Sequence, residues 1–442
     1  MRLVAGALLL AAAAAAGLTS AEEPGAPKPD AADVGDLYEK LFPAQAPEES
    51  GPVAGPSEEE DSRKGLAFGP VTLRPAVTVS YVDGDNVFLD SAQPTHDQYF
   101  VVQPSLGLRI DALTLGSGTF RLSYEPRFRM GSSFEELLEP SHLVDALLEL
   151  PLTPGLTLRA ADHFFVGIVE TTEVDPGREY FFGLGRFARN QVDAGLQIET
   201  GGRFGLELSG SMNRVVFDEQ TSFFDYDQDR VSLTLRYELT PNTRLGFTAG
   251  LERVPGSDER PESRMRAETY GLTLDGDIAP LTTGKIEVGY RDQENPDAAP
   301  GGTRYTGPYA RASVTKEFSR GARLSLGAGR STPLSAFEEN GFYVSTGALG
   351  ALSFPLPLGF AAAAGASYQW NSYRTASSEL GAPREDRIFG WSAGVGRALT
   401  RWCFLRGDYR RDRRYSNVKS LENTAHGFVA QLGIGWFGGE RR

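Results

Sequence analysis

Apolar and polar side chains alternate along much of the chain from residue 66 onward. Three segments show the alternation most clearly: residues 120–130, 231–239 and 428–436. In the second of these the order is Val231, Ser232, Leu233, Thr234, Leu235, Arg236. Successive side chains of a β-strand point to opposite faces, so this period predicts strands with one apolar and one polar face.

The alternation and the turn residues between the segments predict about 18 antiparallel strands. They are expected at residues 71–82, 98–111, 118–130, 142–152, 156–168, 191–200, 203–216, 230–239, 244–253, 266–278, 283–292, 305–318, 322–331, 342–354, 359–372, 386–399, 402–414 and 426–437. A count of 16 is the alternative, because apolar pairs such as Leu143 and Val144 blur the pattern within residues 132–150.

The links between these segments alternate in length. Tight links such as Gly201-Gly202 follow the even-numbered segments, whereas long polar links such as 169–190 and 293–304 follow the odd-numbered ones. Outer-membrane barrels have short periplasmic turns and long external loops, whereas a soluble sandwich gives no reason for such regularity. An open sheet edge in lipid would leave backbone groups unpaired, so the sheet must close. The predicted fold class is all-β, a transmembrane antiparallel up-and-down β-barrel with a disordered N-terminal segment.

Aromatic side chains near the expected strand ends support a membrane barrel rather than a sandwich. They include Tyr368, Trp370, Tyr409, Trp436 and Phe437. Such residues form girdles at the two membrane interfaces. The polar faces of the segments carry many small and charged residues, as a wet lumen would.

Residues 1–21 are expected to be a signal peptide. Arg2 supplies a positive charge, Leu3 to Ala16 is an apolar run too short to span a bilayer, and Thr19-Ser20-Ala21 provides the small residues of a cleavage site. Residues 66–442 then form the barrel, and cell outer membrane is the expected location.

Residues 22–65 differ in composition from the rest of the chain. They contain seven prolines, 12 acidic and four basic residues, which predicts a disordered periplasmic segment. A short helix is expected at residues 33–42, because apolar residues share one of its faces: Val34, Leu37, Tyr38, Leu41 and Phe42. This helix is either a transient turn in a tether or a docking peptide for a periplasmic partner or the barrel mouth.

Two stretches resemble a known family. Tyr81 to Phe88 with Val102 to Leu108, and later Tyr409 to Asn417, are similar to the opening and the penultimate strand of the putative β-barrel porin 2 family. The resemblance covers about residues 68–437 and implies a Gram-negative outer-membrane barrel. Several family members are associated with exopolysaccharide production and export. The resemblance supplies no catalytic residues, and the acidic segment before the barrel departs from the family pattern.

The end of the chain fits the same interpretation. Such barrels close on an alternating strand with a terminal aromatic residue that the barrel insertion machinery reads. Here Trp436-Phe437 is followed by five further residues, which is a small departure.

Candidate chemistry is sparse. No cofactor is expected, because the GxGxxG pattern at Gly433 lies within the last strand rather than before a helix. The four histidines are far apart and Cys403 is the lone cysteine, so neither a metal site nor an internal disulfide is predicted. His96 and His426 map to the outer rim, where a hydrolase would need a general base, but ordinary loop polarity is the simpler explanation.

Charged residues of the expected strands carry the functional hypothesis. The following are predicted to line a pore: Arg121, Glu125, Arg127, Arg129, Arg236, Glu238, Lys285, Glu287, Arg291, Arg406, Asp408, Arg410 and Asp412. They either set up a field across the lumen or pair into a network that rigidifies a closed interior. No inward run of aromatic residues is apparent. Arg411 and Arg413 are expected to point outward and to contact lipopolysaccharide phosphates.

These observations leave three functions open. The first is an outer-membrane pore, porin-like or the outer component of an exopolysaccharide export system, without enzymatic activity. The second is a closed structural barrel that binds a periplasmic partner through residues 22–65, and the third is a rim hydrolase. Expected partners are membrane lipid, lipopolysaccharide, the insertion machinery and, for an exporter, polysaccharide and periplasmic export proteins. The net charge of −14 argues against nucleic acid.

Overall fold

A computed structural model describes most of the chain from residue 65 onward. The described residues are 65–87, 89, 93–111, 113, 118–170, 179, 182–218, 225–256, 264–296, 304–318, 321–335, 341–376, 381–400 and 402–436. The predictions for the signal peptide, the acidic segment, its short helix and Phe437 lie outside these residues. Within the described ranges, no helix is long and apolar enough to cross a membrane.

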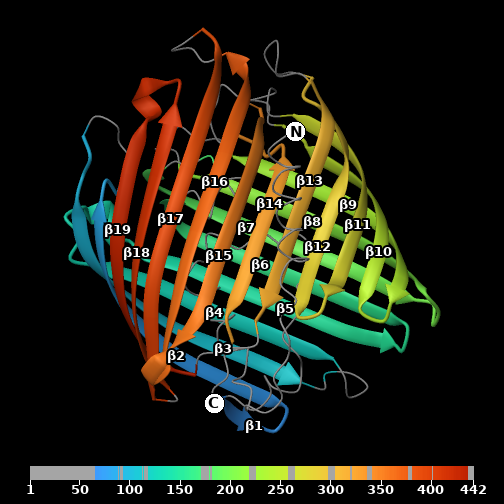
Figure 1. Cartoon of the computed structure of the whole chain (residues 1–442), viewed down its shortest axis with the longest axis horizontal. Helices are drawn as coiled ribbons and strands as arrows, with labels where there is room; N and C mark the ends of the chain where they lie inside the picture. Colours follow the sequence, from blue (N-terminus) through green and yellow to red (C-terminus); the bar gives the residue numbers. More distant parts are fainter. Residues whose placement is uncertain are drawn as a thin grey trace.

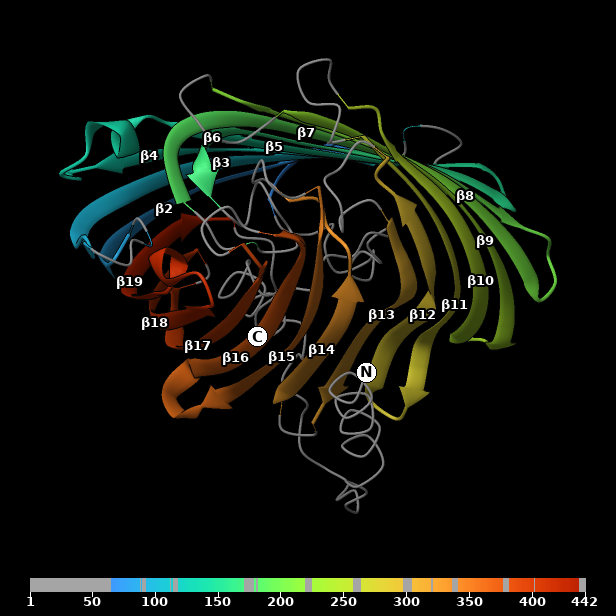
Figure 2. The ribbon, with the colours of Figure 1, turned by 90° about the horizontal axis from the view of Figure 1, so that it is seen from above.

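The chain folds into one closed antiparallel barrel (Figures 1 and 2). Its 18 strands are β2 (Val71–Asp85), β3 (Asp97–Asp111), β4 (Thr119–Met130), β5 (Ser141–Thr153), β6 (Leu156–Glu170), β7 (Phe182–Glu199), β8 (Phe204–Phe217), β9 (Tyr226–Thr240), β10 (Thr243–Val254), β11 (Met265–Ala279), β12 (Thr282–Glu294), β13 (Arg304–Glu317), β14 (Arg323–Ser331), β15 (Tyr343–Leu356), β16 (Phe360–Ala376), β17 (Pro383–Thr400), β18 (Cys403–Ser416) and β19 (Asn423–Gly435). Each strand pairs with the next, and β19 pairs with β2 from Ala76 to Asp85, which closes the ring. The predicted fold class and the count of 18 strands are confirmed, and the alternative count of 16 is wrong.

A short additional strand, β1 (Leu66–Phe68), was not predicted. The chain reverses at Gly69, whose φ of 63° suits glycine, and β1 then pairs with Val71, Thr72 and Leu73 of β2. The pairing of β19 with β2 starts only at Ala76, so β1 covers the end of β2 that β19 leaves unpaired. Three residues are too few to show a period, which is why the sequence did not reveal this strand.

Strand β7 begins at Phe182 rather than at residue 191, where the sequence placed its start. The extension pairs with β6 as far as Glu170, across a register shift between Ile168 and Val169. Within it, Phe187 is buried inside the barrel, whereas Arg186 faces outward and pairs with Glu139. In a membrane strand the apolar side chain usually lies outside and the charged one inside. Here the two positions are exchanged, so the expected alternation is absent from the sequence of this part of β7.

The two faces of the barrel differ sharply in polarity. On the outer face, large apolar side chains are exposed, for example Leu233 at 46% and Leu272 at 53%. On the inner face, polar side chains such as Thr273, Glu207 and Arg291 are buried. A soluble sandwich would bury the apolar set instead, so the exposed apolar band fits a lipid environment.

Substitution of neighbouring residues on β9 tests this assignment. Leu233→Arg should impair folding into membranes, because an arginine near the midplane of the lipid face costs about 2–4 kcal/mol. Ser232→Arg should be tolerated, because Ser232 lies on the inner face and contacts Ser209 at 2.7 Å. Heat-modifiable migration on a gel measures the folded fraction, and equal tolerance of both changes would contradict the assignment of faces.

Candidate functional site

The polar inner face of strands β2 to β19, here called the inner wall, is the candidate site. Strand parity places all thirteen residues that were predicted to line a pore on this wall. On β18 the register alternates inner-wall residues such as Arg406 with outer residues such as Leu405, which is 50% exposed. The predicted set therefore shares one surface, although its members lie on four separate strands.

Charges on β18 pair along the strand rather than across the lumen. Arg406 forms an ion pair with Asp408, and Arg410 contacts Asp412 at 2.5 Å. On the neighbouring strand β17, a Cβ at Gly394 or Gly390 would collide with these two carboxylates. The glycines thus give the carboxylates room to lie flat against the wall, where each neutralises the arginine two residues before it.

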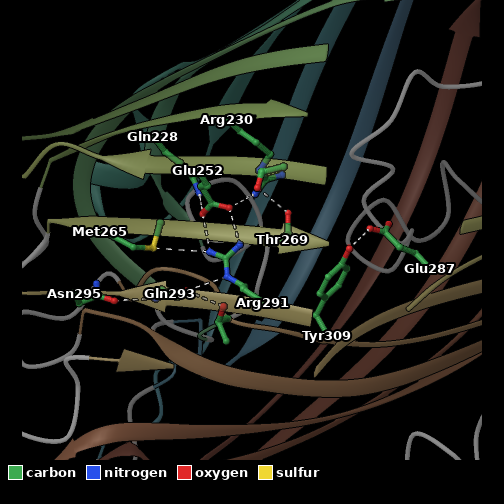
Figure 3. A network of polar contacts seen from close by, with 12 residues as sticks. Gln228, Arg230, Glu252, Met265, Thr269, Glu287, Arg291, Gln293, Asn295 and Tyr309 are labelled. Carbon is green, nitrogen blue, oxygen red and sulfur yellow. Dashed lines mark hydrogen bonds and ion pairs between the residues drawn. The ribbon is translucent and has the colours of Figure 1, made fainter. Parts of the chain in front are cut away.

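Ion pairs also join different strands, and one set surrounds Glu252 of β10 (Figure 3). Arg291 of β12 donates two hydrogen bonds to the Glu252 carboxylate, at 2.8 and 3.0 Å. Arg230 and Gln228 of β9 add contacts at 3.1 and 2.8 Å. Glu252 is only 6% exposed, and a buried carboxylate is tolerated when cationic donors surround it in this way. Arg236 and Glu207, on β9 and β8, form a similar pair.

The chain turns into the barrel after β14 and extends the same network. Thr332 donates to Gln293 of β12 at 2.9 Å, although β13 lies between the two strands. Farther along, the Ser335 hydroxyl donates to Glu179 at 2.6 Å. Glu179 belongs to the connection after β6, so segments 156 residues apart in sequence meet, both almost fully buried.

A second buried cluster centres on Asp386 of β17. Its carboxylate accepts hydrogen bonds from Arg384 at 2.7 Å, from Arg414 at 2.7 Å and from Ser416 at 2.6 Å. Arg384 also stacks over the ring of Tyr373, 4.1 Å from its centroid. Two guanidinium groups thus share one carboxylate beside an aromatic ring, which fixes all of these side chains against the wall.

Aromatic residues do occur on the inner wall, although the sequence shows no inward run of them within any one strand. Tyr309 of β13 lies over Gly289 and Gly271 on the two preceding strands, where a Cβ would strike its ring or hydroxyl. Its hydroxyl donates to Glu287 at 2.8 Å. Further inner-wall aromatic residues are Phe165, Phe187, Phe217, Tyr343 and Tyr373. They stand singly on separate strands, so only the strand register brings them together.

Among the other residues predicted to line the pore, two form hydrogen bonds to uncharged side chains. Glu125 accepts from Gln103 at 2.7 Å, and Arg129 donates to Ser141 at 3.1 Å. Within the described part of the chain, Arg121 and Lys285 make no hydrogen bond or ion pair. Arg127 and Glu238 lie on the same wall.

The sequence reasoning missed several charged residues of the wall. Glu252 occupies a position of β10 whose side chains face the inside of the barrel. The alternation along that strand was therefore sufficient to identify it. Arg384, Asp386 and Arg414 lie at the loop-side ends of β17 and β18, at or beyond the ends of the predicted strands. Their partners come from other strands, so no local pattern indicates the cluster.

Arg411 and Arg413 lie on the outer face of β18, where the sequence placed them. Both are exposed, and Arg413 stacks over Tyr415 at 4.3 Å. On β17, Arg387 shares this face, because it pairs with Tyr415 in the register.

Two histidine–aspartate pairs lie near these arginines, on the outer face and the rim. His426 contacts Asp85 at 2.9 Å, and His96 contacts Asp83 at 3.3 Å. In the part of the chain that the structure covers, no hydrogen bond joins either histidine to a serine, threonine or cysteine side chain that could serve as a nucleophile. Among the described residues there is also no cluster of three potential metal ligands.

Two solved structures are similar to this chain. The outer membrane protein OpdK of Pseudomonas aeruginosa is 10% identical, with 82% of this chain and 98% of that chain covered and a TM-score of 0.45. OccAB2 of Acinetobacter baumannii is 11% identical, with 82% and 98% covered and a TM-score of 0.47. No curated protein matches the chain.

The family model described as "Putative beta-barrel porin 2" matches residues 62–434, which is nearly the whole barrel. The match includes the whole ring except Gly435, the last residue of β19, and it includes the clusters around Glu252 and Asp386. The chain therefore belongs to this family, and it is a β-barrel porin of the outer membrane.

Proposed function

We propose that this porin conducts carbohydrate, as the outer component of an exopolysaccharide export system, and that it performs no chemistry. The observation that carries the proposal is the local pairing of charge on the inner wall. Because arginines and carboxylates neutralise each other along β18 and around Glu252 and Asp386, the wall offers many hydrogen-bonding groups with little uncompensated charge. Such a surface suits a polyhydroxylated solute better than a small ion of one sign.

Tyr309 supports the same class of solute. Its ring lies flat on two glycines in the wall and is partly accessible, unlike the fully buried aromatic residues nearer the loops. Flat aromatic faces combined with hydroxyl and carboxylate groups form favourable contacts with sugar rings. Glu287, which accepts from the Tyr309 hydroxyl, adds an acceptor beside the ring.

Ion selectivity tests the paired wall. The wild-type pore should show a cation-to-anion permeability ratio near one in a planar bilayer under a KCl gradient. Replacing both carboxylates by Asp408→Asn and Asp412→Asn should make the pore anion-selective, because Arg406 and Arg410 then keep uncompensated charge.

Asp229→Asn is the matched control for that pair, since Asp229 is exposed on the outer face and its loss should leave selectivity unchanged. An unaltered reversal potential in the double variant would show that β18 does not line the conducting path. Absence of any conductance in the wild type would contradict the pore itself.

Oligosaccharide block tests the carbohydrate assignment. Tyr309→Ala should weaken the block of single-channel current by a linear oligosaccharide roughly two- to tenfold, because an aromatic contact contributes about 0.5–1.5 kcal/mol. Tyr290→Ala is the matched control: Tyr290 lies on the neighbouring strand β12 but is 48% exposed on the outer face. Equal block of the wild type, Tyr309→Ala and Tyr290→Ala would show that the solute does not contact Tyr309.

We also propose that Arg411 and Arg413 contact lipopolysaccharide phosphates. Both guanidinium groups are exposed on the outer face at the end with long loops, and Arg387 adds a third beside them. Guanidinium groups match phosphate oxygens in geometry and charge.

Lipopolysaccharide retained through purification measures this contact. The Arg411→Ala, Arg413→Ala double variant should retain several-fold less than the wild type. The Arg406→Ala variant should match the wild type, because Arg406 lies on the inner wall. Equal retention by the wild type and the double variant would contradict the contact.

A further inference from the structure

Large apolar side chains stand at the tips of several short links between strands. Leu281, between β11 and β12, is 59% exposed, and Leu358, between β15 and β16, is 80% exposed. Trp402 and Leu113, in the links after β17 and β3, are exposed as well. These four residues are here called the apolar rim. Single exposed apolar residues are common on proteins, but a group of them at one end indicates a contact surface.

Two residues of the apolar rim also have an unfavourable backbone conformation. Leu281 has a φ of 53° and Leu358 a φ of 64°, and each directly follows a proline. This left-handed region favours glycine, because a Cβ atom crowds the backbone there. Glycine at either position would remove the strain and would expose no apolar side chain. The geometry of the turns therefore does not explain why leucine is present.

The apolar rim occupies only one part of the ring. Its links lie along the run of strands from β11 through β19 to β4, whereas β5 to β10 form the remainder. The described short links of that remainder have small or polar tips, namely Pro154-Gly155, Gly201-Gly202 and Pro241-Asn242. Lipid surrounds a barrel on all sides, so contact with the membrane gives no reason for this difference. A one-sided partner does.

Two cations accompany the apolar rim. Lys316 donates a hydrogen bond to the carbonyl of Pro280 at 3.3 Å, beside Leu281. Arg397 lies over the ring of Phe360, 5.1 Å from its centroid and next to the turn that carries Leu358. Neither cation forms an ion pair with a described residue. An apolar segment with acidic flanks would match this surface.

The N-terminal part of the chain leaves the barrel beside the apolar rim. Strand β1 pairs with the beginning of β2, at the end with the short links (Figure 1). Strands β16 to β19 separate β2 from the β15–β16 turn, which is roughly 20–25 Å at about 4.8 Å per strand. Residues 43–65 give a flexible tether a reach of about 26 Å. The tether is therefore long enough for residues 33–42 to reach Leu358.

We propose that residues 33–42 pack as a helix on the apolar rim. The apolar residues of this segment share one helical face, namely Val34, Leu37, Tyr38, Leu41 and Phe42. Residues 22–65 contain 12 acidic and four basic residues, which complements Lys316 and Arg397. A tethered segment has an effective concentration in the millimolar range, on the order of 1 mM, and this favours it over a separate protein. The contact would hold the acidic segment at the periplasmic opening of the barrel.

Cross-linking within the full-length protein in native outer membranes tests the contact. In a Cys403→Ser background, Tyr38→Cys with Leu356→Cys should form an internal disulfide on mild oxidation, seen as a reversible shift of the monomer on a gel. Leu358 and four apolar residues of the segment remain to hold the contact. Tyr38→Cys with Gly202→Cys is the matched control, because Gly202 is exposed at a tip outside the apolar rim. Equal cross-linking of both pairs, or none at Leu356→Cys, would overturn the proposal.

Labelling of Leu356→Cys with a membrane-impermeant maleimide distinguishes the segment from lipid or another protein. In opened outer membranes and the same Cys403→Ser background, Leu37→Asp with Leu41→Asp should raise the labelling rate several-fold by uncovering the turn. Lys40→Asp is the control, because it brings the same change in charge on the opposite face of the helix and should leave the rate unaltered. An unchanged rate in the double variant would assign the turn to lipid, another protein or water and overturn the proposal. An equal rise in the control would overturn the apolar contact.

Discussion

The structure depends on one constraint, the hydrogen bonding of the backbone in a medium without water. Each strand of the ring finds partners on both sides, and the pairing of β19 with β2 removes the last open edge. The pairing with β19 ends at Ala76, and the short strand β1 pairs with Val71, Thr72 and Leu73 at the start of β2. Closure fixes which way every side chain points, because strict alternation then divides the residues into an outer and an inner set.

The residues of the inner wall bring many charges into a confined space, and these charges are paired locally. Pairs two residues apart on one strand, such as Arg410 with Asp412, neutralise charge without crossing the lumen. Glycines on the neighbouring strand provide the hollows into which these side chains fit, as Gly390 does for Asp412. The wall therefore stays polar and hydrogen-bonded while its net charge remains small, and this balance underlies the proposed passage of carbohydrate.

The outer set is apolar over most of the circumference, which makes its exceptions informative. At the end with the long loops, charged and aromatic residues such as Arg413 and Tyr415 suit a headgroup region.

The sequence by itself determined the barrel, the number of strands in the ring and the face of each predicted residue, because these follow from a period of two and from link lengths that are local properties. It did not reveal β1 or the early start of β7, since a three-residue strand has no period and Phe187 lies on the inside. Only the tertiary structure decided which charges meet. Register and closure bring together the segments in which Glu252 contacts Arg291 and Glu179 contacts Ser335. No local sequence pattern indicates either contact.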